Sequence, residues 1–418
     1  MWDDTVQQFS KTVFTTIENR PDSKNREKAF FLMTSLFFMW GLSYGLLDVL
    51  NKHFQDVLHV SKAQSGLLQG AYFGAYFVMA IPAAFLTERF GYKLGILLGL
   101  ALYAIGALIF ILAATVAGFP LFLLGLFIIA SGLGCLETAA NPYVTELGTP
   151  ELAERRLNLS QSFNGLGSFL GPLIGGAFFF PRVPEVTPGA LDSVRITYAA
   201  IAVVVVLLAV LIARTPLPDI RRAINVQSSS RCTPLIGRSH FVAGVVTQFF
   251  YVAAQVGVGA FFINYAIAHW SGLTAQRASF LLSIGMLLFM AGRFVGTMLM
   301  AHITPQRMLM LYALANIALT VVVAMGVPVV SVVALIVVFF FMSIMFPTIF
   351  ALGVKDLGMQ TKRGASFQVM AVVGGAIMPF VMGYVADANG IAVSYMLPLG
   401  CFVIVAWFGG WGCRVRTA

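Results

Sequence analysis

Two acidic residues stand in long uncharged runs of this sequence. Glu137 is the one charged residue between Leu94 and Thr145, and Asp48 directly follows an uncharged run that begins at Ala29. A carboxyl group at the centre of a membrane-spanning helix costs roughly 2.5–3.5 kcal/mol on insertion scales, and such groups usually face a bundle interior where something is bound or moved. We therefore predict that both acids are protonatable groups of a transport site.

Each acid also has an alternative explanation that involves no transport role. Glu137 can be a structural carboxylate that bonds to a neighbouring helix, although a neutral Gln would serve that purpose equally well. Asp48 can lie near the outer end of its helix, in contact with water, where Lys52 at i+4 can pair with it.

The residue types beside the two acids are typical of carbohydrate binding. Trp40 and Tyr44 precede Asp48 at four-residue spacing, so the three side chains share one helix face. Aromatic rings can stack on the C–H surface of a sugar while the acid accepts hydroxyl protons. Asn141 follows Glu137 at i+4, and Pro142 removes a backbone hydrogen bond there. We expect all five polar or aromatic side chains to contact substrate.

Further polar side chains recur at helical spacing in later apolar segments. We assign to the substrate site Gln161, Asn164, Gln248, Tyr251 and Gln255. Amides also bond membrane helices to one another, so each residue alone is divided between that role and ligand contact. Arg293, inside an apolar segment, can extend to the cytoplasmic face or pair with a buried acid. We assign it and Gln368 to gating.

Composition defines the elements that must position these residues. The 418 residues are 59% hydrophobic and only 10% charged, against about 25% charged in soluble domains. Runs of about 20 apolar residues span a membrane as helices. The runs are Ala29–Leu47 with Asp48, Ala63–Thr87, Leu94–Thr145, Leu157–Pro181, Ile196–Ala213, Ser239–His269, 275–301, Met308–Val354, Ala365–Ala386 and Ile391–Cys413. Two runs are double length and break near Thr115–Pro120 and Gly326–Pro328, so we predict an all-α polytopic protein of twelve transmembrane helices.

The two halves of the chain resemble each other. Pro142 and Gly148 recur 205 residues later, and Arg156, Gln161 and Pro172 recur 207 residues later as Arg363, Gln368 and Pro379. Two six-helix repeats of this kind are the architecture of the major facilitator superfamily. We expect an N-terminal segment at 1–28, a first bundle at 29–213, a linker at 214–238, a second bundle at 239–413 and a tail at 414–418.

The basic residues indicate the orientation. With both termini in the cytoplasm, 20 of the 26 Lys and Arg residues fall on the cytoplasmic side and 5 on the other, with Arg293 inside a helix. This bias follows the positive-inside rule, so the formal charge of +9 reflects cytoplasmic loops and not nucleic-acid binding. The scattered histidines and the four cysteines show no metal-ligand or disulfide spacing, and no cleavable signal peptide is visible.

The sequence around Glu137 resembles the fucose–galactose–glucose:proton symporter family. The resemblance is carried by Glu137–Pro142, Arg156–Leu159, Gln161, Asn164, Gln248–Phe249, Gln255, Gly292–Phe294 and Pro347–Phe350. It implies alternating access to one central cavity, with Asp48 and Glu137 as the protonatable pair and with Gln161 and Asn164 facing the sugar. Where fucose-transporting members have an Asn-rich approach to the first acid, this chain has Ser43–Leu47, which favours another sugar of the glucose, galactose or N-acetylglucosamine class.

These observations predict a proton-coupled monosaccharide symporter in a bacterial inner membrane, acting as a monomer and without a cofactor or resident metal. A sodium-coupled sugar carrier remains an alternative, and a drug-efflux antiporter is a weaker one because amide stripes do not suit a large apolar cavity. No nucleophile–base set or phosphate-binding loop is present, so neither an enzyme nor an ATP-driven pump is expected.

Overall fold

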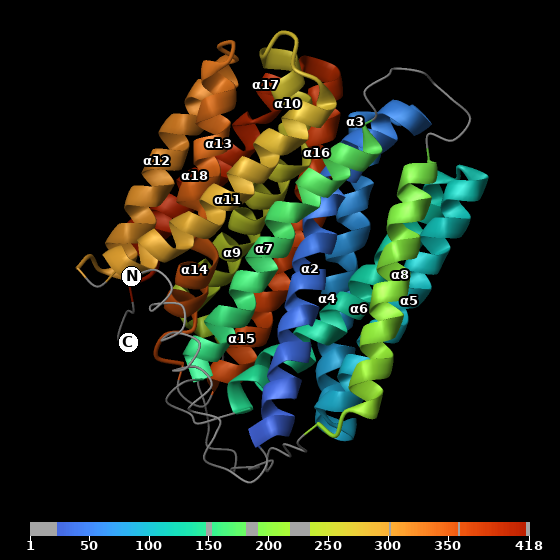
Figure 1. Cartoon of the computed structure of the whole chain (residues 1–418). Coiled ribbons are helices and arrows are strands. Elements are labelled where there is room, and N and C mark those ends of the chain that lie inside the picture. Colours follow the sequence, from blue (N-terminus) through green and yellow to red (C-terminus); the bar gives the residue numbers. More distant parts are fainter. Residues whose placement is uncertain are drawn as a thin grey trace, which may run out of the picture.

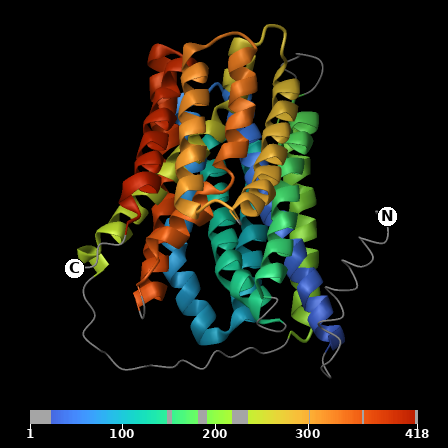
Figure 2. The ribbon, with the colours of Figure 1, turned by 90° about the vertical axis from the view of Figure 1, so that its left-hand side faces the viewer.

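The computed structural model describes residues 23–147, 153–180, 191–217, 235–300, 302–357 and 360–414. Throughout these ranges the ordered elements are helical, and no strand occurs among them. Figure 2, viewed from the side of the C-terminal helices, shows the long helices running along one common axis. This arrangement follows from the sequence, because a hydrocarbon environment requires each backbone N–H and C=O to be satisfied within its own helix.

Within its described residues, the N-terminal half contains seven α-helices. They are α2 (Ser23–Leu58), α3 (Lys62–Ser65), α4 (Leu67–Phe90), α5 (Tyr92–Val116), α6 (Phe119–Glu146), α7 (Ala153–Phe179) and α8 (Asp192–Arg214). The C-terminal half begins with η2 (Leu235–Gly237) and continues as α9 (Ser239–Ala260), α10 (Phe262–His269), α11 (Ala275–Leu299), α12 (Pro305–Met325), α13 (Val330–Met342), α14 (Met345–Gly353), α15 (Thr361–Met370), η4 (Ala371–Val373), α16 (Gly374–Asn389), α17 (Ile391–Ser394), α18 (Met396–Trp407) and η5 (Phe408–Gly412).

The prediction of an all-α protein with twelve spans is confirmed. Within the described ranges, eleven helical segments are long and apolar enough to cross a membrane, several of them joining adjacent short helices. The twelfth is α7, whose 27 residues include the polar stripe with Gln161 and Asn164. Both predicted breaks are present, since α5 ends before Ala117 and α12 ends before Gly326, each with a left-handed backbone.

Two features of the helices differ from the sequence prediction. The first helix does not stop near Asp48 but continues ten residues further to Leu58, because Lys52 and Asp56 pair with each other at i+4, 2.6 Å apart. The helix that carries Pro347 is interrupted at Ser343 and Ile344, which divide α13 from α14. The first difference moves Asp48 from a helix end to a helix interior.

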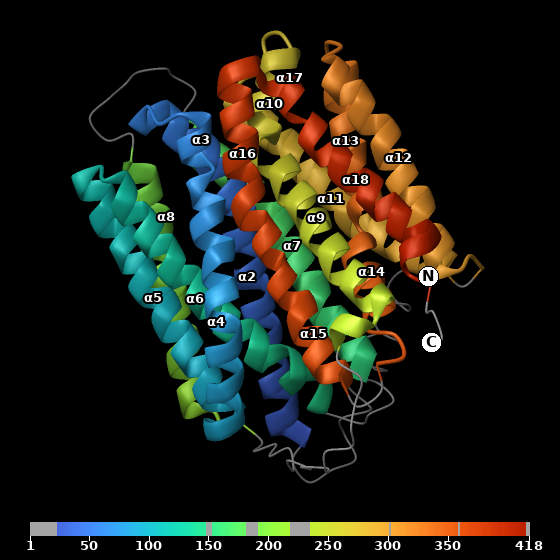
Figure 3. The ribbon, with the colours of Figure 1, turned by 180° about the vertical axis from the view of Figure 1, so that it is seen from behind.

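The two halves meet along helices that lie side by side. In Figure 1, α7 runs beside α11 between the halves, and Figure 3 shows α4 beside α16 on the opposite face. Within the N-terminal half, α2 packs closely against α7, where Gly41 lies against the Asn164 carbonyl and leaves no room for a Cβ. The interface between the halves is formed mainly by α7 with α11 and by α4 with α16, and α2, the helix that carries Asp48, adds contacts to α9 and α10.

One end of this interface is closed by polar contacts, and we call it the sealed end. Asp387 of α16 accepts hydrogen bonds from the backbone N–H groups of Lys62 and Ala63, and it pairs with the Lys62 ammonium at 3.2 Å. Asn264 of α10 donates to Gln55 of α2 at 2.6 Å. These contacts join the N-terminal half to the C-terminal half at the upper end of Figure 1.

Candidate functional site

Asp48 is buried where the two halves meet. Its side chain is 2% exposed, and its Oδ1 accepts a hydrogen bond from Gln69 of α4 at 3.4 Å. Its Oδ2 has no hydrogen-bond partner among the described residues and points at α9, where a Cβ on Gly259 would lie 2.7 Å from it. A glycine on α9 therefore makes room for a carboxyl group of the other half. The alternative pairing with Lys52 is excluded, because Lys52 pairs with Asp56.

Glu137 lies in the interior of α6 and is partly exposed. Its electrostatic neighbours are Tyr72 and Tyr76 of α4. The hydroxyl groups of both tyrosines are buried and have no hydrogen-bond partner among the described residues. A carboxyl group beside two unsatisfied phenols is an arrangement that a polyhydroxylated ligand can complete, because each phenol can donate and accept one hydrogen bond.

Tyrosine rings connect the surroundings of the two acids. Tyr44 lies near Asp48 on its own helix, and its ring is 6.5 Å from that of Tyr72. Tyr72 in turn lies 5.3 Å from Tyr76, beside Glu137. Trp40, one turn before Tyr44, has its indole beside the hydroxyl groups of the same two α4 tyrosines. The structure thus brings Trp40, Tyr44 and both acids to one region of the N-terminal half.

The polar residues of α6 and α7 contact each other and α2. Gln161 of α7 donates at 3.4 Å to Asn141, which lies one turn from Glu137 on α6. Asn164 donates to the backbone carbonyl of Phe37 at 3.2 Å, so in this conformation its amide bonds α7 to α2. Both amides therefore bond α7 to a neighbouring helix, Gln161 to α6 and Asn164 to α2, and their contact with a ligand stays a prediction.

The residues predicted on α9 occupy three different surroundings. Gln255 lies beside the Tyr44 hydroxyl across the interface between the halves. Tyr251 is fully buried and donates to the carbonyl of Met342, the last residue of α13, at 2.8 Å. Gln248 is fully buried, and neither polar atom of its amide has a partner among the described residues. Of these three, Gln255 is the one that the structure brings to the acid-bearing region.

The two residues predicted to take part in gating lie in the C-terminal half. Arg293 of α11 has its guanidinium carbon 5.2 Å from the centre of the Phe289 ring and interacts electrostatically with Tyr251. Gln368 of α15 is fully buried against Gly244 and Gly353, and its amide atoms have no partner among the described residues. Neither residue contacts Asp48 or Glu137, so their gating roles stay predictions.

No basic side chain pairs with Asp48 or Glu137 within the part of the chain that the structure describes. The same part contains no group of three His, Cys, Asp or Glu side chains that could hold a metal ion. Cys135, Cys401 and Cys413 are free and buried, whereas Cys232 lies outside the described residues. Within these residues, neither acid is therefore held in its charged form by an ion pair.

Sequence reasoning missed the contribution of α4. Gln69, Tyr72, Phe73 and Tyr76 line the face of α4 that is turned toward Asp48 and Glu137. Their spacing of i, i+3, i+4 and i+7 is that of one helix face, and two tyrosines with an amide in a lipid-spanning helix are a detectable polar stripe. This polar stripe was visible in the second apolar run, but no charged residue in that run marked the helix as part of a site.

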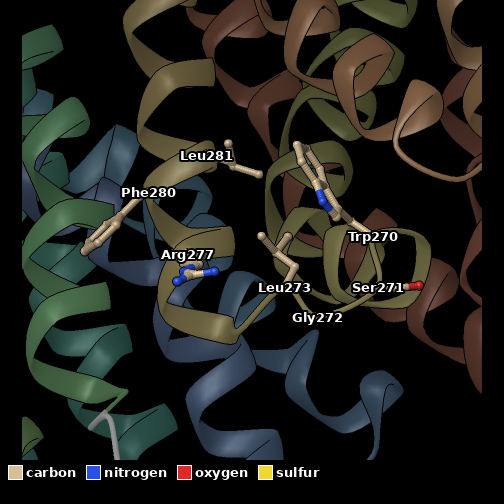
Figure 4. Close-up of a pocket in the computed structure, with 7 residues that line it drawn as sticks. All are labelled: Trp270, Ser271, Gly272, Leu273, Arg277, Phe280 and Leu281. Atoms are coloured by element: carbon tan, nitrogen blue, oxygen red, sulfur yellow. The ribbon is translucent and has the colours of Figure 1, made fainter.

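A surface hollow of about 360 Å³ lies away from this region. Figure 4 shows Trp270 facing Leu281, with Arg277 below them, where α10 turns into α11. The remaining lining residues are Ser271, Gly272, Leu273 and Phe280. None of the predicted site residues lines this hollow.

The fold and this site define a membrane transport protein, and comparison with known proteins identifies its family. The model of the Major Facilitator Superfamily matches residues 29–379, so the chain belongs to that superfamily. The chain is 39% identical to the L-fucose-proton symporter of Escherichia coli over 93% of this chain and 94% of that protein. It is 37% identical to a glucose/galactose transporter of Brucella abortus over 92% and 94% of the two chains.

A solved structure shares both the fold and part of the sequence. The transporter FucP, crystallised in the outward conformation, is 38% identical to this chain. The structural match covers 94% of this chain and 100% of FucP, with a TM-score of 0.69. The chain therefore belongs to the sugar–proton symporter family that the motif around Glu137 indicated, and the predicted family membership is confirmed.

Proposed function

We propose that this protein is a proton-coupled symporter that imports a monosaccharide by alternating access. The observation that carries the proposal is the pair of acids in the N-terminal half, which have no basic partner among the described residues and are connected by tyrosine rings. Relatives that are 39% and 37% identical are named for L-fucose with protons and for glucose and galactose. Phenols, an indole, amides and acids in one region supply the contacts that a sugar needs.

The two acids have complementary places in this mechanism. Burying a neutral carboxylic acid in the occluded state costs little free energy, whereas burying an unpaired carboxylate in an apolar environment costs much more. Glu137, beside the unsatisfied phenols of Tyr72 and Tyr76, is proposed to bind sugar hydroxyls. The protonation state of Glu137 is proposed to change the strength of that binding. Asp48, at the interface between the halves, is proposed to take up and release the coupled proton. Coupling then requires that sugar and proton favour the same conformational change.

The residues proposed to contact the sugar are assigned from where their side chains lie in the site. We propose that Trp40 and Tyr44 present ring faces and that Asn141, Gln161 and Gln255 supply amide hydrogen bonds. Asn164, Gln248 and Tyr251 are proposed to join the site in another conformation of the cycle, because in this one they bond to backbone or lie buried. Arg293 and Gln368 are proposed to act in gating.

The energy available from one proton is sufficient for accumulation. A charge that moves down a membrane potential of roughly 100 mV releases about 2.3 kcal/mol. At tenfold per about 1.4 kcal/mol, this supports a sugar gradient on the order of fifty-fold. The same arithmetic holds for sodium, so the coupling ion has to be decided by the ion dependence of transport.

We further propose the setting in which the protein works. The chain is multi-pass and its relatives are bacterial, which supports a bacterial inner membrane, and the distribution of basic residues supports cytoplasmic termini. The sealed end then faces outward, and the bundles 29–213 and 239–413 are the two bodies that rock about the site. A monomer is sufficient, because both acids and all proposed sugar contacts belong to one chain.

Uptake of labelled monosaccharides into proteoliposomes tests the proposal. We expect accumulation of one sugar of the fucose, glucose, galactose or N-acetylglucosamine class when the lumen is alkaline relative to the outside. Sugar-dependent alkalinisation of the outer medium should accompany it. Uptake that needs a sodium gradient and does not depend on the pH gradient would identify sodium as the coupling ion. If none of these sugars is transported, the proposed substrate class is wrong.

A further inference from the structure

Four amide side chains connect Asp48 to the contact that closes the sealed end. Each amide donates to the next in one direction: Asn264 to Gln55 at 2.6 Å, Gln55 to Asn51 at 2.7 Å, Asn51 to Gln69 at 3.1 Å and Gln69 to Asp48 at 3.4 Å. We call this chain the amide relay. Its first member belongs to the C-terminal half and its other members to the N-terminal half, so it is complete only while the halves touch at this end.

The chemistry of the groups fixes the direction of the relay. An ionised carboxyl group can only accept, so Gln69 must turn its N–H group to Asp48 and its carbonyl to the next amide. Each following amide is oriented in the same way for the same reason. Ser65 reinforces the direction, because its hydroxyl donates to the Lys62 carbonyl at 2.8 Å and accepts from the Gln55 N–H at 2.8 Å.

The surroundings of Asp48 leave the relay with a large influence on its charge. Asn51 and Gln69 are fully buried, so water does not replace their hydrogen bonds. The titratable groups that face the carboxyl are Tyr44 on the same helix and Tyr395 at the start of α18, while α9 presents a glycine. Among the described residues, the Gln69 N–H is the hydrogen-bond donor to this carboxyl. Bonds in series in a low-dielectric interior strengthen one another.

We propose that the amide relay couples closure of the sealed end to release of the proton from Asp48. With the end closed, the N–H of Asn264 completes the relay and all four donors point toward the carboxyl, which favours the carboxylate. When the halves separate at this end, Asn264 leaves, the relay loses its terminal donor, and the neutral acid is favoured. Gln69, Asn51, Gln55 and Asn264 are thus positioning residues of the proton site, and the inference rests on the function proposed above.

The direction of this effect matches import. A site that prefers its proton while the end is open takes the proton up from that side. A site that prefers the carboxylate once the end is closed gives the proton up to the other side. The relay therefore supplies the differential proton affinity between the two conformations that coupling demands.

An infrared titration of the full-length protein in proteoliposomes tests the relay without any sugar. The carboxylic-acid band of Asp48 is identified by its loss in Asp48→Asn, and the pH of half-protonation is then measured. We expect Asn264→Ala and Gln69→Met each to raise that pH by about one unit, a tenfold gain in proton affinity, because a hydrogen bond to the charged form is lost. Gln64→Ala, which alters an exposed side chain at the same end outside the relay, should leave it unchanged.

The double variant separates the relay from a simple loosening of the sealed end. If Asn264 acts through the relay, Asn264→Ala adds nothing in the Gln69→Met background, because the connection is already interrupted. Additive shifts, or no shift in either single variant, would overturn the inference. Should Gln69→Met fail to fold, Asn51→Leu interrupts the relay at the preceding link. A wild-type protein that titrates as expected but accumulates no sugar would refute the proposed function and leave the relay standing.

Discussion

The first helix of each half carries the same pattern with different charge. Tyr44 and Asp48 on α2 are followed 207 residues later by Tyr251 and Gln255 on α9, so a tyrosine precedes an acid in one half and an amide in the other. The N-terminal half therefore holds an ionisable group where the C-terminal half holds a neutral one. Across the interface, Gln255 nevertheless lies beside Tyr44, so the neutral member faces the charged one.

A second pair of corresponding positions repeats the contrast. Glu137 lies inside the unbroken helix α6, and the residue 205 positions later is Met342, where α13 ends. The Tyr251 hydroxyl donates to the Met342 carbonyl, whereas Tyr44 faces Gln255 and Asp48. One half thus carries the two acids proposed to change charge, while at corresponding positions of the other half a tyrosine stabilises an interrupted helix.

The largest expected effect is that of Glu137→Gln. It removes one of the two groups that can change charge, so accumulation driven by a pH gradient should fall by about a hundredfold or more while sugar exchange without a gradient is retained. Uptake and counterflow in proteoliposomes measure the two activities. Asp192→Asn, at an exposed acid that pairs with Arg195 on α8, is the matched control and should keep both. Wild-type accumulation in Glu137→Gln would break the contrast between the halves.

Asp48→Asn comes next and addresses the pH dependence. Because the amide cannot release a proton, initial uptake should become nearly independent of pH, and accumulation should fall about tenfold or more. Initial rates measured across a pH series give the profile. Asp56→Asn changes an acid of the same helix that is paired with Lys52 and exposed, so its profile should follow wild type. An unaltered profile in Asp48→Asn would remove this residue from the coupling scheme.

Gln255→Glu sharpens the comparison by giving the second half an acid at the corresponding position. A carboxylate beside Tyr44 and close to Asp48 places two like charges at the interface, which disfavours ionisation of both. We expect transport to decrease several-fold and its alkaline limit to move to higher pH, since the protonated forms persist longer. Gln255→Met, a neutral change of similar size, serves as the control. An identical response of both variants would show that charge at this position is irrelevant.

Tyr44→Phe and Tyr251→Phe distinguish the two tyrosines. Loss of the Tyr251 hydroxyl leaves the buried Met342 carbonyl without that partner and should cost about 1 kcal/mol of stability, with a smaller rise in the sugar KM than Tyr44→Phe causes. Loss of the Tyr44 hydroxyl should raise the sugar KM several-fold and leave the thermal midpoint unchanged. Thermal unfolding in detergent and uptake kinetics give the two readings. The assignment fails if Tyr44→Phe lowers the midpoint and spares the KM.

The smallest effect is expected for Asp387→Asn at the sealed end. The Lys62–Asp387 pair is partly exposed, so its removal should shift the balance of conformations by about 1 kcal/mol or less. Alkylation of a cysteine introduced at Ser65, a fully buried residue beside Lys62, reports access to the sealed end, and it should become slightly faster in the variant. Slower alkylation would contradict the assignment of this contact as a closure.

The sequence was sufficient for the span count and for the breaks at Ala117 and Gly326. It also singled out Asp48 and Glu137, which lie in the interiors of α2 and α6, while their roles stay predictions. It failed for α4, because Gln69, Tyr72 and Tyr76 carry no charge and their importance depends on which helix face turns toward the acids. It also ended the first helix too early, since the i+4 pair that continues it looked like the end of an apolar run.

The amino-acid sequence by itself determined that this chain crosses a membrane twelve times and carries two acids within its spans. The physical reason is local: hydrocarbon demands that each segment satisfy its own backbone, so apolar runs become helices and charges within them stand out. Only the tertiary structure decided that Gln69 and Asn264, far apart in the chain, belong to one relay that ends at Asp48. Lateral packing of helices brings such side chains together, and no periodicity within a single helix records which neighbour it will meet.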